Sequence, residues 1–172
     1  MISRIRVPLG FIVAAAVLYF ATPTGTSILL GLPVAIIGAV FRALAAGAIR
    51  KDAQLASSGP YAWTRNPLYF GSSLLALGFA IMSANALTAA LVLVPSLLIY
   101  PQVIRSEEAH LERLFQDDFR SYRSNVPRFF PRFSAAFKPS FSFQQYVANR
   151  EYNTILGFSA ALAVFVAKWW RR

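Results

Sequence analysis

The chain has 172 residues, of which 56% are hydrophobic and only 14% are charged, and its mean hydropathy is +0.50. An average soluble domain carries about 25% charged residues, so a soluble domain fits poorly. Lys and Arg outnumber Asp and Glu by 17 to 7, a formal charge of +10. The high apolar content argues against a disordered or nucleic-acid-binding basic protein. The absence of cysteine excludes disulfides, thiolate metal sites and cysteine nucleophiles. A small basic membrane protein fits these numbers.

Five apolar stretches approach the length of about 20 residues that a helix needs to cross the hydrocarbon layer. They cover residues 7–21, 27–49, 67–83, 87–104 and 152–170. The link between the third and the fourth, Ala84–Asn85–Ala86, is so short that the two must form a helical hairpin. We therefore predict an all-α fold in one domain, residues 1–172, built as an integral-membrane bundle of four to five transmembrane helices.

The distribution of basic residues predicts the orientation of this bundle, because cytoplasmic loops are enriched in Lys and Arg. Arg4 and Arg6 precede the first stretch, Arg50 and Lys51 follow the second, and eight basic residues lie between positions 105 and 150. These segments are placed in the cytoplasm, and a bacterial inner membrane is the expected location. If the last stretch crosses, its basic tail emerges on the opposite side. We prefer this crossing to a helix that lies along the interface.

The first polar segment ends in Thr64-Arg65-Asn66-Pro67, where the third apolar stretch begins. Pro67 suits the first turn of a helix, and a helix N-terminus offers unpaired N–H groups and a positive dipole end. An anionic ligand group is favoured at such a place. The alternative is a loop anchored by interfacial aromatic residues, with Arg65 contacting lipid phosphates.

The second polar segment continues the fourth stretch as an amphipathic helix, because apolar residues recur every three or four positions. These are Leu111, Leu114, Phe115, Phe119 and Tyr122. Glu107 and Glu108 lie where this helix leaves the membrane, a costly place for a carboxylate without a partner or a ligand. The alternative is a solvated helix start in which Arg105 and Arg113 form ion pairs with them.

Two further residues are candidate functional residues for separate reasons. Arg42 lies inside the second apolar stretch, where a charge is expensive and marks a candidate functional site. It could instead extend toward the interface or pair with a helix carbonyl. His110 is the sole histidine, a residue type that can serve as a general base. Without a neighbouring Cys or Asp partner it supports no metal site, and none is expected.

Three motifs in series are together more specific than any one of them. They are Gly59-Pro60-Tyr61, then Arg65-Asn66-Pro67-Leu68-Tyr69-Phe70-Gly71, and then Glu107-Glu108-x-x-Leu111-x-x-x-Phe115. Over residues 38–131 this series resembles the integral-membrane methyltransferases of the isoprenylcysteine carboxyl methyltransferase and phospholipid N-methyltransferase family. Residues 132–172 are then an extension with an amphipathic segment and a candidate fifth transmembrane helix.

The resemblance implies a helical bundle with a cytoplasmic motif helix that binds S-adenosylmethionine without a Rossmann sheet. The chain has no Gly-x-Gly, which agrees with that expectation. The implied cofactor-binding residues are Tyr61, Arg65, Asn66, Pro67, Tyr69, Glu107 and Glu108. Catalytic roles are expected at three residues, Arg105, Arg42 and Glu108. Arg105 or Arg42 would clamp a carboxylate acceptor, and Glu108 or His110 would take the proton from an amine acceptor.

Two departures from the family's pattern affect the predicted substrate. Asn66 stands where carboxyl-methylating members usually have His, and Val103 stands where Arg is expected. We expect a lipid or prenylated small-molecule substrate, membrane lipids as neighbours and no nucleic acid. Carboxyl O-methylation is the leading hypothesis. The alternatives are phospholipid amine N-methylation, a sterol-reductase-like NADPH enzyme on a related bundle, and a non-enzymatic scaffold that binds anionic lipid.

Overall fold

The computed structural model describes residues 13–133 and 140–171 of the chain. These residues form helices and loops, with no β-strand among them, as predicted for an all-α fold. Residues 13–20 are helical, and the elements that follow are α2 (Gly25–Ala48), the 3-10 turn η1 (Gly59–Ala62), α3 (Pro67–Ser83), α4 (Ala86–Asn125), α5 (Phe143–Ala148) and α6 (Tyr152–Trp170). The first predicted stretch, 7–21, begins outside the described residues.

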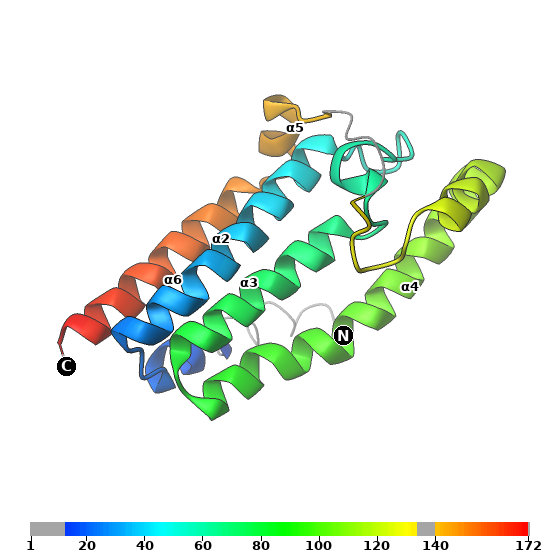
Figure 1. The fold of residues 1–172 in the computed structure, drawn as a ribbon. Coiled ribbons are helices and arrows are strands. Elements are labelled where there is room, and N and C mark those ends of the chain that lie inside the picture. The colour runs from blue at the N-terminus through cyan, green and yellow to red at the C-terminus, as the bar shows by residue number, and fades with distance from the viewer. Residues whose placement is uncertain (1–12, 134–139, 172) are drawn as a thin grey trace, which may run out of the picture.

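Three of the described helices, α2, α4 and α6, are long and apolar enough to cross a membrane. The fourth apolar helix, α3, is shorter at 17 residues. Figure 1 shows α6 beside α2, α2 beside α3, and α3 joined to α4 by a tight turn. We call the end of the bundle where α2 finishes and α3 begins its polar end.

Paired glycines let α2 and α3 approach closely. A Cβ atom at Gly38 of α2 would lie 2.6 Å from the carbonyl oxygen of Gly71 in α3, and one at Gly31 would lie 2.5 Å from that of Gly78. Glycine removes the side chain that would hold the two backbones apart, as it does in other membrane helix pairs. Gly71 and Gly78 therefore allow α3 to pack closely against α2.

The C-terminal helix α6 packs antiparallel to α2. Phe165 of α6 is fully buried in a cluster with Ala35 of α2 and Met82 of α3. At the far end of the helix, Lys168 Nζ donates hydrogen bonds to the carbonyl oxygens of Leu18 and Tyr19, 2.9 and 2.7 Å away. These carbonyls end the helical segment 13–20, so one lysine joins the two ends of the described chain.

The hairpin between α3 and α4 is as tight as the sequence predicts. Ala84 closes α3 in the left-handed conformation with φ of 46°. Asn85 then caps α4, because its side-chain oxygen accepts a hydrogen bond from the N–H of Thr88 at 3.0 Å. Pro67 occupies the first turn of α3, as expected.

The long helix α4 differs from the prediction because it is not continuous. Gln116 has non-helical angles, φ 40° and ψ −111°, and the chain turns back there. Arg120 and Arg123, after the break, lie 3.5 and 3.4 Å from the carboxylate of Glu112, before it. The following residues 126–133, which we call the return segment, run back to the loop before α3 (Figure 1). The break is what brings these residues to the polar end.

Candidate functional site

A pocket of about 400 Å³ lies at the polar end of the bundle. Its walls are the last turns of α2, the loop before α3, the first turn of α3, and the part of α4 that follows its apolar half. Seven predicted site residues line it together: Arg42, Tyr61, Arg65, Asn66, Pro67, Tyr69 and Glu107. Two predicted residues, Arg105 and Glu108, are not among the lining residues.

The return segment holds in place residues 63–66, between η1 and α3, which we call the motif loop. The backbone N–H of Arg65 donates to the carbonyl of Pro127 at 2.9 Å, and that of Arg132 donates to the carbonyl of Trp63 at 2.9 Å. Between them, the hydroxyl of Thr64 is buried and donates to the carbonyl of Phe129 at 2.9 Å. A loop fixed on both sides in this way can present its side chains in one arrangement.

Glu108 is the centre of a buried ion-pair cluster. Its side chain is 7% exposed and lies 2.9 Å from Arg128 Nη2 and 3.4 Å from Arg65 Nε. The side-chain amide of Asn66 donates to the same carboxylate at 3.3 Å and to the carbonyl of Arg128 at 2.9 Å. Two guanidinium groups share one carboxylate, so this cluster keeps a surplus positive charge. Glu108 therefore joins the motif loop, α4 and the return segment, rather than facing the pocket.

The neighbouring carboxylate, Glu107, has the opposite environment. It is exposed, lines the pocket, and accepts a hydrogen bond of 2.8 Å from the phenol of Tyr69 in α3. The ring of Tyr69 lies 5.3 Å from the ring of Tyr100 in α4. Glu107 thus keeps acceptor capacity for a ligand that offers hydroxyl or amino groups.

Arg65 is the least satisfied charged group in the described part of the site. Its side chain is 8% exposed, and Nε lies within ion-pair distance of Glu108 without forming a hydrogen bond to it. Nη1 is also buried without a hydrogen-bond acceptor among the described residues. Burial lowers the pKa of this guanidinium, and the charge of Glu108 works against that effect. Beside it, Asn66 makes no side-chain capping bond to α3. A buried donor next to an uncapped helix N-terminus is suited to an anionic ligand group.

Tyr61 is a buried wall of the pocket and stays a neutral phenol. Burial, followed by the neighbouring Tyr122 and Glu107, raises its pKa well above the usual value. Its backbone carbonyl accepts a 2.7 Å hydrogen bond from the phenol of Tyr122, which also lines the pocket. Tyr61 can therefore contribute an aromatic face and a protonated hydroxyl.

Arg42 lines the pocket from α2 and is paired by the C-terminal extension. Its Nε and Nη2 atoms donate to the two carboxylate oxygens of Glu151 at 2.7 and 2.8 Å. Its Nη1 atom donates to the hydroxyl of Ser72 in α3. Neither of the alternatives considered for Arg42, extension to the interface or a bond to a helix carbonyl, anticipated a carboxylate 109 positions away.

The solvent rim of the pocket carries a second charged pair. His110 Nε2 lies 3.1 Å from Asp52 Oδ1, and both side chains are about half exposed or more. Asp52 belongs to the loop that follows α2, where its φ of 59° is left-handed. His110 thus has the acidic neighbour that its sequence context did not show.

Sequence reasoning missed several residues that line the pocket. They are Ile49, Arg50, Lys51, Asp52, Gln54, Leu55, Ala56, Leu68, Leu111 and Tyr122, to which His110 adds a residue considered only as a proton acceptor. Most lie in the loop just after α2. In the sequence, only the polar composition of this loop beside an apolar stretch indicated that it could contribute to a site. Tyr122 was assigned to an apolar helix face, and nothing local indicated the break at Gln116 that turns it inward.

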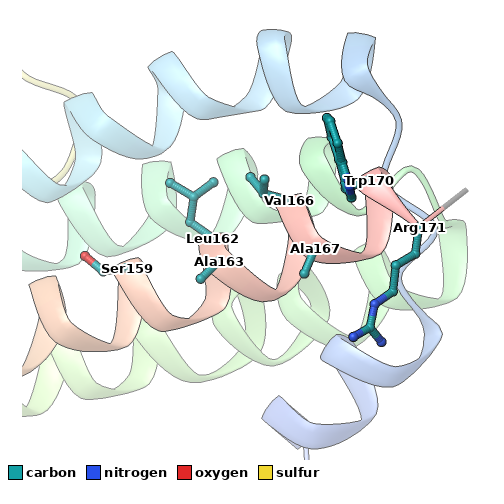
Figure 2. A pocket seen from close by; sticks show the side chains of 7 residues that line it. All are labelled: Ser159, Leu162, Ala163, Val166, Ala167, Trp170 and Arg171. Carbon is teal, nitrogen blue, oxygen red and sulfur yellow. The ribbon is translucent and has the colours of Figure 1, made fainter.

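A second hollow, of about 600 Å³, lies along α6 (Figure 2). The described residues that line it belong to α6 and its C-cap, Arg171: Ser159, Leu162, Ala163, Val166, Ala167, Trp170 and Arg171. One hydroxyl and one cation on an otherwise apolar helix face offer little to orient a polar ligand. Within residues 13–133 and 140–171, no group of three or more His, Cys, Asp or Glu side chains could hold a metal ion.

Comparison with known proteins identifies the family. The model of the phospholipid methyltransferase family matches residues 9–118, and the chain belongs to that family. This match begins inside the first apolar stretch, which the motif resemblance over residues 38–131 left out. The protein is thus a member of a membrane methyltransferase family, and its apolar helices are those of an integral membrane protein.

Individual relatives share about a third of the aligned residues. The nickel-cobalt-cadmium resistance protein NccN of Alcaligenes xylosoxydans xylosoxydans is 37% identical over 106 residues, 62% of this chain and 49% of that protein. The cobalt-zinc-cadmium resistance protein CzcN of Cupriavidus metallidurans gives the same identity over 62% of this chain and 48% of its own length. The protein-S-isoprenylcysteine O-methyltransferase of Schizosaccharomyces pombe is 33% identical over 94 residues, 55% of this chain and 40% of its own length. The matched part of this chain spans half or less of each relative. No solved structure matches.

Proposed function

We propose that this protein is an S-adenosylmethionine-dependent methyltransferase that methylates the carboxyl group of a lipid-like substrate of the isoprenylcysteine type. The observation that carries the proposal is Arg65, a residue of the pocket lining whose buried guanidinium has donors that lack a hydrogen-bond acceptor among the described residues. Family membership and the yeast relative, which is named as an isoprenylcysteine O-methyltransferase, support the same reaction class.

The pocket fits the proposed cofactor in size and in chemistry. Its volume of about 400 Å³ falls within the range of about 300–1,000 Å³ of small-molecule sites. Arg65 and the start of α3 would bind the carboxylate of the methionine part, and Glu107 would accept hydrogen bonds from ribose hydroxyl or amino groups. The rings of Tyr61 and Tyr69 would contact the adenine or the cationic sulfur.

The proposed methyl transfer requires mainly that the acceptor is aligned with the S–CH3 bond and that water is excluded. When bound, S-adenosylmethionine supplies a methyl group already activated on sulfur, which passes to a carboxylate oxygen as the S–CH3 bond breaks. No proton is taken up or released, so the side chains need only orient the acceptor and exclude water. Of the two clamps considered, Arg42 lines the pocket and Arg105 does not. We therefore propose that Arg42 binds the carboxylate of the acceptor.

The pocket is proposed to lie at the cytoplasmic face of a bacterial inner membrane. Arg50 and Lys51 line it, and the basic residues between 105 and 150 lie after the apolar half of α4. Such segments are retained in the cytoplasm. Membrane lipids would surround the apolar faces of α2, α4 and α6.

A second candidate reaction is N-methylation of a phospholipid amine. It is favoured by the pair of His110 and Asp52 at the rim, because an amine must lose a proton before it accepts a methyl group. Transfer of a radiolabelled methyl group to prenylcysteine analogues and to phosphatidylethanolamine separates the two reactions. An ester product is released by base, whereas an N-methyl product is stable to it.

Titration calorimetry of the detergent-purified protein tests the cofactor directly. S-adenosylmethionine is expected to bind and NADPH is not. Arg65→Gln removes a charged donor, worth about 1.5–3 kcal/mol, so affinity should fall about tenfold to a hundredfold. Arg113→Gln, an exposed change on α4 away from the pocket, is the matched control. Absence of S-adenosylmethionine binding to folded protein would overturn the proposal, and binding of NADPH would favour the reductase alternative.

A further inference from the structure

The C-terminal extension contributes one carboxylate next to the pocket, that of Glu151. This residue lies beyond the family match, which ends at residue 118. It is 6% exposed, immediately before α6, and forms a two-point contact with Arg42. A paired fork of this kind fixes the plane of a guanidinium as well as its position. Arg42 is thereby held in one orientation in the pocket wall.

The contact leaves Arg42 with capacity for a ligand. Arginine has five N–H groups, and the contacts to Glu151 and Ser72 occupy one each on Nε, Nη2 and Nη1. One N–H remains on each terminal nitrogen. These two N–H groups could orient a bound carboxylate. Glu151 already offsets part of the positive charge of Arg42, so the carboxylate would be held mainly by the direction of these hydrogen bonds.

Other contacts already hold the extension on the bundle. The side-chain amide of Asn149 donates to the carbonyls of Ala46 and Ile49 at 2.8 and 3.1 Å, where α2 ends. The N–H of Ser142 donates to the carbonyl of Gly47 at 2.9 Å. Lys168 fixes the opposite end of α6. The attachment of α6 thus has several supports, whereas in the described part of the site the ion pair of Arg42 is made by Glu151 alone.

We propose that Glu151 is a positioning residue that holds Arg42 for the carboxylate of the methyl acceptor. The inference rests on the proposed function and deepens it. The pocket runs from the exposed pair of Asp52 and His110 to Arg42 inside the apolar helix α2. A lipid-like acceptor arrives from the hydrocarbon side, so its carboxylate meets the Arg42 end. The extension thereby completes the acceptor site of this chain.

Steady-state kinetics with a prenylcysteine acceptor tests this role. Glu151→Gln is expected to lower kcat/KM for the acceptor about tenfold to a hundredfold, because misplacing an orienting group by about 1 Å has effects of that size. The dissociation constant of S-adenosylmethionine should stay within about twofold. Calorimetry without the cofactor gives a second readout: Glu151→Gln should lose the preference for a prenylcysteine carboxylate over its methyl ester.

Two sets of variants separate positioning from attachment. Asn149→Ala and Lys168→Gln remove other contacts of the extension and are expected to keep kcat/KM. Arg42→Glu combined with Glu151→Arg retains an ion pair between α2 and the start of α6 but moves the guanidinium off α2. This reversed pair should recover thermal stability without recovering kcat/KM.

The outcomes distinguish the two levels of the proposal. Recovery of kcat/KM by the reversed pair, or an equal loss in Asn149→Ala, would show that the pair only attaches α6, and would overturn the positioning role. Unchanged kcat/KM in Glu151→Gln would do the same while leaving the methyltransferase proposal intact. A wild-type protein that binds no S-adenosylmethionine would overturn the proposed function and this inference with it.

Discussion

At the scale of single residues, the adjacent pair Glu107 and Glu108 divides into one pocket residue and one structural residue. Successive helical positions point about 100° apart, so neighbours cannot share one environment. Glu108 is directed to Arg128 and Arg65, and Glu107 to the pocket and Tyr69. Neutralising one carboxylate is therefore expected to affect a different property of the protein than neutralising the other.

Glu108→Gln should destabilise the protein, whereas Glu107→Gln should weaken ligand binding. Removing one partner of a buried ion pair costs about 3–5 kcal/mol. In a chain of this size that lowers the thermal midpoint by several degrees, at about 2–4 °C per kcal/mol. Thermal unfolding followed by tryptophan fluorescence, with S-adenosylmethionine titration of both variants, makes the comparison. Equal midpoints for the two variants would contradict the division.

The sequence predicted which residues gather at the site better than it predicted what each one does. Tyr61, Arg65, Pro67, Tyr69 and Glu107 all line the pocket, because local motifs place the first four around the start of α3 and Glu107 just beyond the apolar half of α4. The burial of Glu108 depends on Arg128, 20 positions away, and that contact needs the chain to turn at Gln116. Neither Gly nor Pro marks this break, so no local pattern indicated it.

At the scale of helices, the contact between α2 and α3 shapes the pocket. Arg42 follows Gly38 by one turn in α2, and Tyr69 precedes Gly71 in α3, so the spacing of these helices sets the distance across the pocket. The glycines face backbone atoms, which cannot move aside as a side chain can. The apolar pattern predicted that these helices exist, and the glycines allow their backbones to approach closely.

Gly38→Ala should destabilise the bundle and weaken ligand binding together. The new Cβ would lie 2.6 Å from both the carbonyl oxygen of Gly71 and the amide nitrogen of Leu75. The helices must separate, and overpacking of this kind costs about 1–3 kcal/mol. Thermal unfolding and calorimetric titration measure the two effects.

The matched control is Gly157→Ala in α6, where nothing lies within 4 Å of the new atom. There the better helix propensity of alanine should be neutral or stabilise by up to about 1 kcal/mol. Equal midpoints in Gly38→Ala and Gly157→Ala would show that the close approach of α2 and α3 contributes nothing to stability.

At the scale of the whole molecule, hydropathy predicted both ends of α2, α3 and α6 to within two residues, and for α4 it predicted the start. Apolar stretches 67–83 and 152–170 coincide with α3 and α6. What hydropathy could not supply is which helix packs against which, because a lipid-facing side and a helix-facing side are both apolar. The place of α6 beside α2 depends instead on long-range contacts, among them Glu151 with Arg42 and Lys168 with the carbonyls of Leu18 and Tyr19.

The antiparallel packing of α6 on α2 predicts on which side of the membrane the C-terminus emerges. Glu151 lies at the polar end, and a Cβ at Gly25, at the start of α2, would lie 3.3 Å from the ring of Trp169. If α2 crosses the membrane, α6 crosses it in the reverse direction. Its basic tail then lies with the start of α2, against the usual charge bias.

Because the chain has no native cysteine, single cysteines can report this arrangement without background labelling. We expect a membrane-impermeant maleimide to label Thr26→Cys and Arg171→Cys in intact bacterial cells. Ser121→Cys, exposed in the part of α4 that follows the break at Gln116, should react only after the membrane is permeabilised. Labelling of Arg171→Cys together with Ser121→Cys would place α6 along the interface. In that case Lys168 and Trp169 could not make these contacts in the membrane. The extension would then contact the bundle only at its polar end.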